Sequence, residues 1–128
     1  MDCDYKQIGQ RSYPIIPLTV KYGLAVHETD ALIDSGSLLS LFHIDVARRL
    51  GIAYKNGTPQ MVASIQGRLL VYIHEFEIVI GQEKICCRVG FSDDFKPALN
   101  ILGRIDFFEH FTVLFDEKDK KVTLTPYD

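Results

Sequence analysis

The chain has 128 residues, a length that favours one folded domain and argues against a two-domain enzyme with an interdomain site. Apolar residues make up 47% of the sequence and charged residues 24%, a composition that excludes intrinsic disorder. The net charge is −3 with no block of like charges, which argues against general affinity for nucleic acid or for a membrane surface.

The first residues and the cysteines both indicate a cytoplasmic protein. Two prolines interrupt the first apolar stretch, so it does not resemble a secretory signal, and no run approaches the ~20 apolar residues of a membrane-spanning helix. Cys86 and Cys87 are adjacent and too close for an ordinary disulfide, while Cys3 lies in residues 1–11, which we expect to form a mobile or dimer-contacting arm. Reduced thiols fit a reducing compartment.

Alternation of apolar and polar residues with a period of two dominates the chain and predicts an all-β domain. The predicted strands are Ser12–Val20, Leu24–His27, Ala31–Ile33, Leu69–Ile80, Glu83–Phe91, Phe111–Phe115 and Lys121–Thr125. Helical spacing occurs only in His43–Leu50, which Gly51 ends, and in Arg104–His110. Many short strands with two small helices favour a β-barrel-like or sandwich domain.

The segment Ala31–Ser37 reads Ala-Leu-Ile-Asp-Ser-Gly-Ser and places a carboxylate directly after a short apolar strand. Because burial of an uncompensated charge is unfavourable, Asp34 either points out of the sheet or lies in a polar site. Gly36 allows a tight turn, in which backbone N–H groups and the hydroxyls of Ser35 and Ser37 can hold the carboxylate ionised. On these residues alone, an ordinary turn at the end of a strand explains the motif equally well.

A second segment favours the functional interpretation. Residues 100–104 read Asn-Ile-Leu-Gly-Arg, an apolar pair followed by Gly at the start of a short predicted helix. Together, the Asp-Ser-Gly motif and this segment resemble the retropepsin-like aspartic proteases, in an order and spacing that run from about Pro14 to Thr125. The resemblance implies a single retropepsin-like domain over residues 1–128, a closed β-barrel with one or two short helices.

The resemblance also implies a mechanism and a partner. In the family, the Asp at the position of Asp34 is one half of a catalytic pair that activates a water molecule to hydrolyse a peptide bond, without a metal or other cofactor. The chain contains only one Asp-Ser/Thr-Gly, so the second carboxylate would come from a second copy, and the active form would be a homodimer acting on an extended peptide or protein. The residues expected to support this site are Ser35, Gly36, Ser37, Ile101, Leu102, Gly103 and Arg104, with Leu32 and Ile33 beneath them.

A flap, a hairpin that covers the substrate, is a further expectation of the resemblance. The segment between Pro59 and Tyr72 fits best. The flap residues would be Ala63, Ser64, Ile65, Gln66 and Gly67. Flaps of the family are richer in Gly, so an ordinary hairpin stays an alternative.

A departure from the family pattern concerns the position after the motif. Retroviral members place an acid there that pairs with the Arg of the second segment, whereas this chain has Leu38. We therefore expect Arg104 to pair elsewhere, for example with an acid of the partner chain. This departure and the Gly-poor flap favour a rival interpretation, in which the same fold serves as a dimerisation or peptide-binding module without catalysis.

Other chemistries are weaker interpretations. The four histidines and the adjacent cysteines lack the spacing of metal ligands, so no metal site is expected. A serine nucleophile would need a Gly-x-Ser-x-Gly turn, which the sequence lacks. The aromatic residues predicted to belong to the core are Phe107, Phe108, Phe111 and Phe115.

Overall fold

The computed structural model describes residues 1–64, 67–95 and 98–128, and 59% of these described residues are in β-strands. The strands are β1 (Asp2–Asp4), β2 (Lys6–Ile8), β3 (Arg11–Tyr13), β4 (Ile15–Tyr22), β5 (Ala25–Ile33), β6 (Ser40–Leu41), β7 (Thr58–Ser64), β8 (Gly67–Ile80), β9 (Glu83–Phe91), β10 (Asn100–Leu102), β11 (Phe111–Asp116) and β12 (Lys121–Pro126). The other elements are the helix α1 (Ile44–Leu50) and two single turns, η1 (Tyr54–Asn56) and η2 (Arg104–Phe108).

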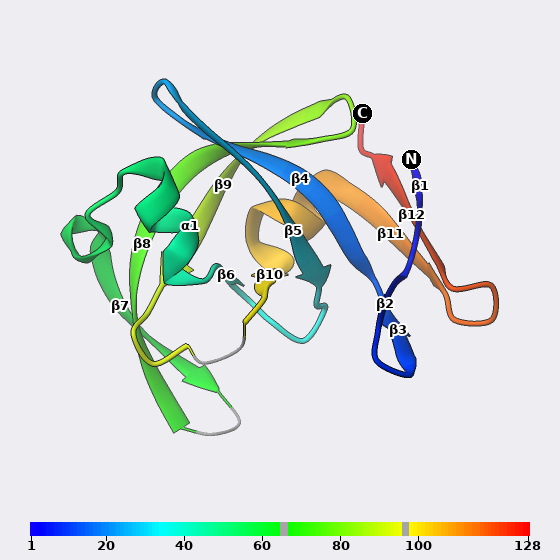
Figure 1. Ribbon diagram of the computed structural model, residues 1–128, viewed down its shortest axis with the longest axis horizontal. Coiled ribbons are helices and arrows are strands. Elements are labelled where there is room, and N and C mark those ends of the chain that lie inside the picture. The colour runs from blue at the N-terminus through cyan, green and yellow to red at the C-terminus, as the bar shows by residue number, and fades with distance from the viewer. Residues whose placement is uncertain (65–66, 96–97) are drawn as a thin grey trace.

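Six strands close into a barrel, which confirms the predicted all-β barrel. The hydrogen-bonded order is β4-β5-β10-β6-β9-β8, and β8 pairs back to β4 with Val20 opposite Ile78 (Figure 1). Closure removes the free edges that an open sheet would expose. The first residues of β8 extend beyond the barrel, where β7 is their only partner strand among the described residues.

Strand β10 lies between two strands that precede it by about 60 residues or more. It runs parallel to β5, with Ile101 opposite Leu32, and antiparallel to β6, with Ile101 opposite Leu41. The loop that joins β5 to β6 therefore begins and ends on the two sides of β10. This arrangement brings the two sequence motifs, residues 31–37 and 100–104, side by side.

The alternation along the strands fills the barrel with apolar side chains. On β9, Ile85, Cys87, Val89 and Phe91 are buried, as the period of two predicts. Each large apolar side chain that is fully buried contributes about 1.5–3 kcal/mol to stability. The largest such side chains are Phe42, Phe91, Phe107, Ile16, Ile78, Ile80, Leu102 and Leu124.

Helix α1 is confirmed with its predicted boundaries to within one residue. It begins after His43, whose Nδ1 accepts the N–H of Asp45 at 3.1 Å, and it ends at Gly51, which has a φ of 72°. Its buried face packs against β5.

Three predicted elements differ from the structure. Residues 25–33 form one strand, not two, because the polar residues in its middle stay paired with β4 on a partly exposed face. The predicted strand Ser12–Val20 is divided at Pro14, where β3 ends and β4 begins. The predicted helix Arg104–His110 forms in an interrupted shape: residues 104–108 make the π-helical turn η2 and residues 109–110 continue it, but Ile105 and Asp106 have non-helical backbone angles.

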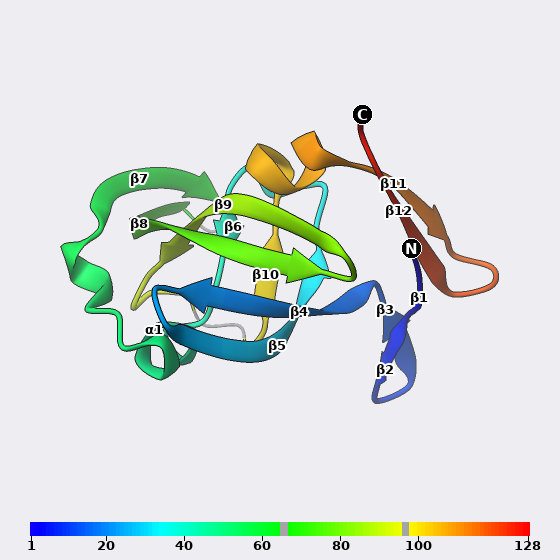
Figure 2. The ribbon, with the colours of Figure 1, turned by 90° about the horizontal axis from the view of Figure 1, so that it is seen from above.

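Smaller sheets lie outside the barrel. Strands β1, β12 and β11 form a three-stranded sheet that brings the two ends of the chain together, and β2 and β3 form a two-stranded ribbon that projects from the body (Figure 2). Much of the predicted arm, residues 1–11, thus lies in β1 and β2. Within the described ranges, the helices are all too short to cross a membrane.

Candidate active site

Asp34 is half-buried at the carboxyl end of β5, where the chain leaves the barrel wall. Its backbone N–H donates to the carbonyl of Leu102 on β10 (3.0 Å), so the second motif holds the first directly. The backbone N–H of Gly36 donates to the Asp34 carboxylate Oδ1 (2.9 Å), and the N–H of Ser37 donates to the Asp34 carbonyl (3.2 Å).

Hydrogen bonds from the segment that follows β10 hold the Asp34 loop, residues 34–39. The backbone N–H of Arg104 donates to the carbonyl of Ser37 (2.9 Å), and the N–H of Ile105 donates to that of Leu38 (2.8 Å). The Arg104 guanidinium also donates through Nη1 to the carbonyl of Ser35 (3.3 Å). These three bonds fix the loop while leaving the Asp34 side chain accessible.

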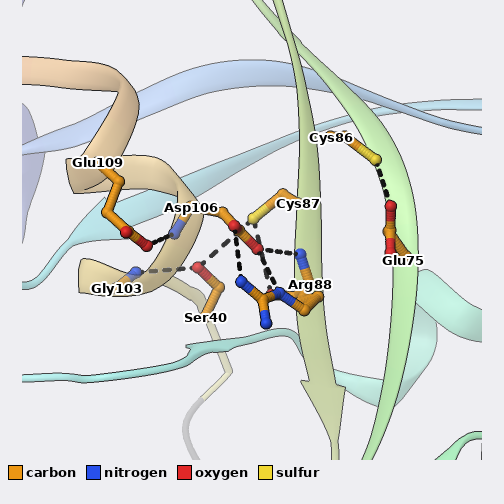
Figure 3. A network of polar contacts seen from close by, with 8 residues as sticks. All are labelled: Ser40, Glu75, Cys86, Cys87, Arg88, Gly103, Asp106 and Glu109. Carbon is orange, nitrogen blue, oxygen red and sulfur yellow. Dashed lines mark hydrogen bonds and ion pairs between the residues drawn. The ribbon is translucent and has the colours of Figure 1, made fainter.

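Gly103 is the point of closest approach between the two motifs. A Cβ at this position would lie 2.7 Å from the carbonyl carbon and oxygen of Leu39 and 2.8 Å from the carbonyl oxygen of Ser37. Only glycine permits this distance, because the neighbouring atoms belong to the backbone. The buried hydroxyl of Ser40 accepts the Gly103 N–H (3.0 Å), and the buried Cys87 thiol lies 3.8 Å from the same hydroxyl (Figure 3).

The serine hydroxyls act differently from the sequence expectation. The hydroxyl of Ser37 donates to the carbonyl of Leu39 (2.7 Å) and so stabilises the loop, rather than holding the carboxylate. Ser35 is exposed. Of the supporting residues predicted beneath the site, Leu102 and Ile33 are buried, whereas Ile101 and Leu32 are partly exposed.

Strands β7 and β8 form the hairpin predicted between Pro59 and Tyr72, and it projects past the barrel toward the same edge of the view as the Asp34 loop (Figure 1). Ser64 pairs with Gly67 at its end, and Ala63 is exposed. The other two predicted flap residues, Ile65 and Gln66, lie outside the described residues.

The base of this hairpin and the Asp34 loop both approach Gly90 on β9. Val71 of β8 and Leu39 are both buried, and a Cβ on Gly90 would lie 3.2 Å from the Val71 side chain and 3.1 Å from that of Leu39. Glycine at this position leaves the space that both side chains occupy.

An ion pair beneath the site was not anticipated from the sequence. Arg88 on β9 contacts Asp106 in η2 through its backbone N–H, Nε and Nη2, at 2.9 to 3.1 Å (Figure 3). Burial raises the pKa of Asp106, but the hydrogen bonds and charge of Arg88 outweigh this effect and leave that pKa below its ordinary value. No sequence pattern indicates the pairing, because apolar spacing in residues 104–110 favours a helix instead.

Two surface hollows lie away from Asp34. One, of about 390 Å³, lies between the β8–β9 turn and the terminal sheet, and the other, of about 210 Å³, lies between β5 and α1. Across residues 1–64, 67–95 and 98–128, no three His, Cys, Asp or Glu side chains gather as metal ligands would. The Asp34 loop is the place where the structure brings the two sequence motifs, residues 31–37 and 100–104, into direct hydrogen-bond contact.

The chain was compared with protein-family models and with curated proteins. No family model matches it, and no curated protein matches it. Any function for this barrel is therefore argued from its own residues and geometry.

Proposed function

We propose that the protein is an aspartic endopeptidase of retropepsin-like fold, active as a homodimer with Asp34 of each copy as the catalytic pair. One observation carries the proposal: β10 lies parallel to β5, and Gly103, the residue that follows β10, lies directly against the Asp34 loop. A turn that ends a surface strand needs no such support. The close contact, the two backbone hydrogen bonds, the bond from the Arg104 guanidinium and the accessible carboxylate together fit a site that holds one acidic side chain rigidly.

The proposed chemistry needs two carboxyl groups that share one proton. Two carboxylates about 3 Å apart do not both ionise, so the pair holds one charged and one protonated group. The charged group takes a proton from a water molecule as its oxygen attacks the peptide carbonyl, and the protonated group donates to the carbonyl oxygen. The tetrahedral intermediate then collapses, the C–N bond breaks, and the leaving nitrogen receives a proton.

A second copy supplies the second Asp34, and the surroundings of the first copy support such an encounter. The carbonyl of Pro14 accepts the N–H of Ile33 (3.0 Å), so the chain just before β4 lies beside the residue that precedes Asp34. The β2–β3 ribbon rises from this place and exposes Ile8 and Tyr13. A two-stranded ribbon is only marginally stable by itself in water. We infer that this ribbon and the edge bearing Asp34 face the partner copy.

The β7–β8 hairpin would cover an extended peptide and exclude water from the pair. Exposed apolar side chains of Leu38, Met61 and Leu70 are available around the loop and along the hairpin. The three free cysteines of the structure, Cys3, Cys86 and Cys87, support a reducing compartment such as the cytoplasm.

Replacement of Asp34 by Asn tests the proposal directly. The variant should lose cleavage of unstructured protein substrates across the acid and neutral pH range, while its far-UV circular dichroism and sedimentation match those of the parent. Asp45→Asn is the matched control, because this acid is exposed on α1 and its ion pairs among the described residues are with its neighbours His43 and Arg48. Cleavage by Asp34→Asn at the parental rate would refute the mechanism.

A tight-binding statine peptide separates this proposal from the rival one. Inhibition of cleavage by the peptide supports catalysis by the Asp34 pair. Binding of the peptide by a chain that cleaves nothing would instead favour a peptide-binding module. The Gly-poor hairpin and Leu38 are the features on which that second function depends.

A further inference from the structure

Asp106 has a backbone conformation that side-chain-bearing residues rarely adopt. Its φ is 70° and its ψ is −53°, close to the strained form of the γ-turn. Such strain persists only where the surrounding contacts over-determine it, and it is common at functional sites. Asp106 lies two residues after Arg104, whose backbone N–H holds the Asp34 loop. The contacts that stabilise Asp106 therefore bear on the site.

Those contacts come chiefly from one residue of the barrel wall. Arg88 donates its backbone N–H and Nε to Oδ2 of Asp106 (2.9 and 3.0 Å) and its Nη2 to Oδ1 (3.1 Å), as Figure 3 shows. The N–H of Asp106 donates to Glu109 Oε1 (2.8 Å). A two-pronged arginine–carboxylate pair fixes direction as well as distance. We call these two residues the Arg88–Asp106 clamp.

The clamp differs from an ordinary surface pair on the same protein. Arg48 on α1 reaches Asp45 through one nitrogen (2.7 Å), and both side chains are more than 60% exposed. In the clamp, the side chain of Asp106 is 20% exposed and receives three donors from one residue. Surface pairs of the first kind contribute little to stability, whereas a partly buried fork holds its geometry.

A short series of covalent and hydrogen bonds connects the clamp to the Asp34 loop. Asp106 is adjacent to Ile105, whose N–H donates into the loop (2.8 Å), and Arg104 donates to the carbonyl of Ser37 (2.9 Å). The N–H of Ser37 in turn donates to the carbonyl of Asp34 (3.2 Å). If η2 loses its strained conformation, the N–H groups of Arg104 and Ile105, which donate to the loop, change direction together.

We propose that the Arg88–Asp106 clamp is a positioning device, which holds η2 in its strained form so that the N–H groups of residues 104 and 105 fix the Asp34 loop. Because Arg88 belongs to β9, the clamp connects η2, and through it the Asp34 loop, to the rigid barrel wall. The consequence for catalysis rests on the proposed function. The consequence for the loop does not, so the two are tested separately.

Backbone hydrogen exchange tests the effect on the loop. Arg88→Gln removes the fork, Asp106→Asn keeps the shape of the side chain without its charge, and Arg48→Gln is the matched control. The amides to follow are those of Ser37, Arg104 and Ile105. We expect exchange about tenfold faster at these amides in the first two variants, with barrel amides unchanged, and parental rates in the control. Unchanged loop amides, or acceleration spread evenly over the barrel, would overturn the proposal.

The pH dependence of cleavage tests the effect on the pair. A displaced Asp34 loop changes the distance between the two carboxyls, so the apparent pKa values of the kcat/KM profile should move in Arg88→Gln and move less in Arg88→Lys. A mere loss of folded enzyme scales the profile without moving it, and that result would overturn the positioning role. If the parent cleaves nothing, the proposed function fails, and the exchange experiment still decides whether the clamp holds the loop.

Discussion

Gly103→Ala should damage the site more than any other single methyl group added to the chain's described glycines. The added Cβ would lie 2.7 Å from two backbone atoms of Leu39, whereas ordinary contact begins at 3.4 Å. The loop must therefore retreat by about 0.7 Å, against the hydrogen bonds that residues 104 and 105 donate to it. Overpacking of this kind lowers the free energy of unfolding by about 1–3 kcal/mol, and the backbone contact places this case near the upper value. The corresponding fall in Tm is about 10 °C.

Under the proposed function, the same displacement should reduce catalysis. A misplacement of reacting groups by about 1 Å lowers the rate about 100-fold, so a shift of about 0.7 Å should lower kcat/KM by about 10- to 100-fold. Urea unfolding followed by circular dichroism gives the stability, since the chain has no Trp for fluorescence. Protomer concentration must be held constant, because formation of the proposed dimer would contribute to the measured stability.

Gly81→Ala is the matched control for this prediction. Gly81 has a φ of 60°, and its added Cβ meets only the flexible side chain of Met1 among the described residues, beside a hollow whose lining includes no residue of the Asp34 loop. It should lower stability by about 1–2 kcal/mol and leave cleavage per folded molecule unchanged. The steric reasoning is refuted if Gly103→Ala unfolds within about 0.5 kcal/mol of the parent, or if both variants lose activity equally.

Three further outcomes are expected. The hydrogen bond to Glu75 raises the pKa of the exposed Cys86 thiol, so Glu75→Gln should speed alkylation of Cys86 at neutral pH, as mass spectrometry of the labelled peptide would show. The pKa of Asp106 is lower in the folded than in the unfolded state, so the charged carboxylate stabilises the fold at pH values above its unfolded pKa. The free energies of unfolding of the parent and of Asp106→Asn should therefore differ at neutral pH and converge as the pH falls through the folded-state pKa of Asp106. Ile8→Lys on the exposed ribbon should raise the dissociation constant of the dimer about tenfold by sedimentation, whereas Leu24→Lys, on a fully exposed turn, should not.

Elements with strong local patterns could be predicted from the sequence. The alternation on both sides of Gly81 defines the long β8–β9 hairpin, and the apolar spacing before Gly51 defines α1. These predictions succeed because the period of the pattern and the turn residue give the same answer over many residues. The contacts that hold Asp34 in place could not be predicted in this way. Strand β10 has only three residues, too few for a period to be recognised, and the family resemblance alone indicated its importance.

Long-range contacts explain what the sequence could not predict. The spacing of apolar residues in 104–110 resembles a helix, yet an arginine 18 residues earlier in the chain holds Asp106 in a non-helical form. Phe107 and Phe111 are buried as predicted, but Phe115 is 37% exposed, so its core prediction is wrong. It lies on β11, an edge strand that pairs only with β12 among the described strands. For Asp106 and for Phe115, contacts made in the folded protein decide the outcome, rather than the local spacing of apolar residues.

The position of β10 has a consequence for biosynthesis. Ile101 pairs with Leu32 and Leu41, so the cradle of Asp34 is completed by residues synthesised about 60 to 70 positions later. A nascent chain that has emerged only as far as β9 carries the acidic motif without its support. Such delayed assembly, with its long loop closure, slows folding and leaves the Asp34 loop without its supporting hydrogen bonds until residues 100–105 have been synthesised.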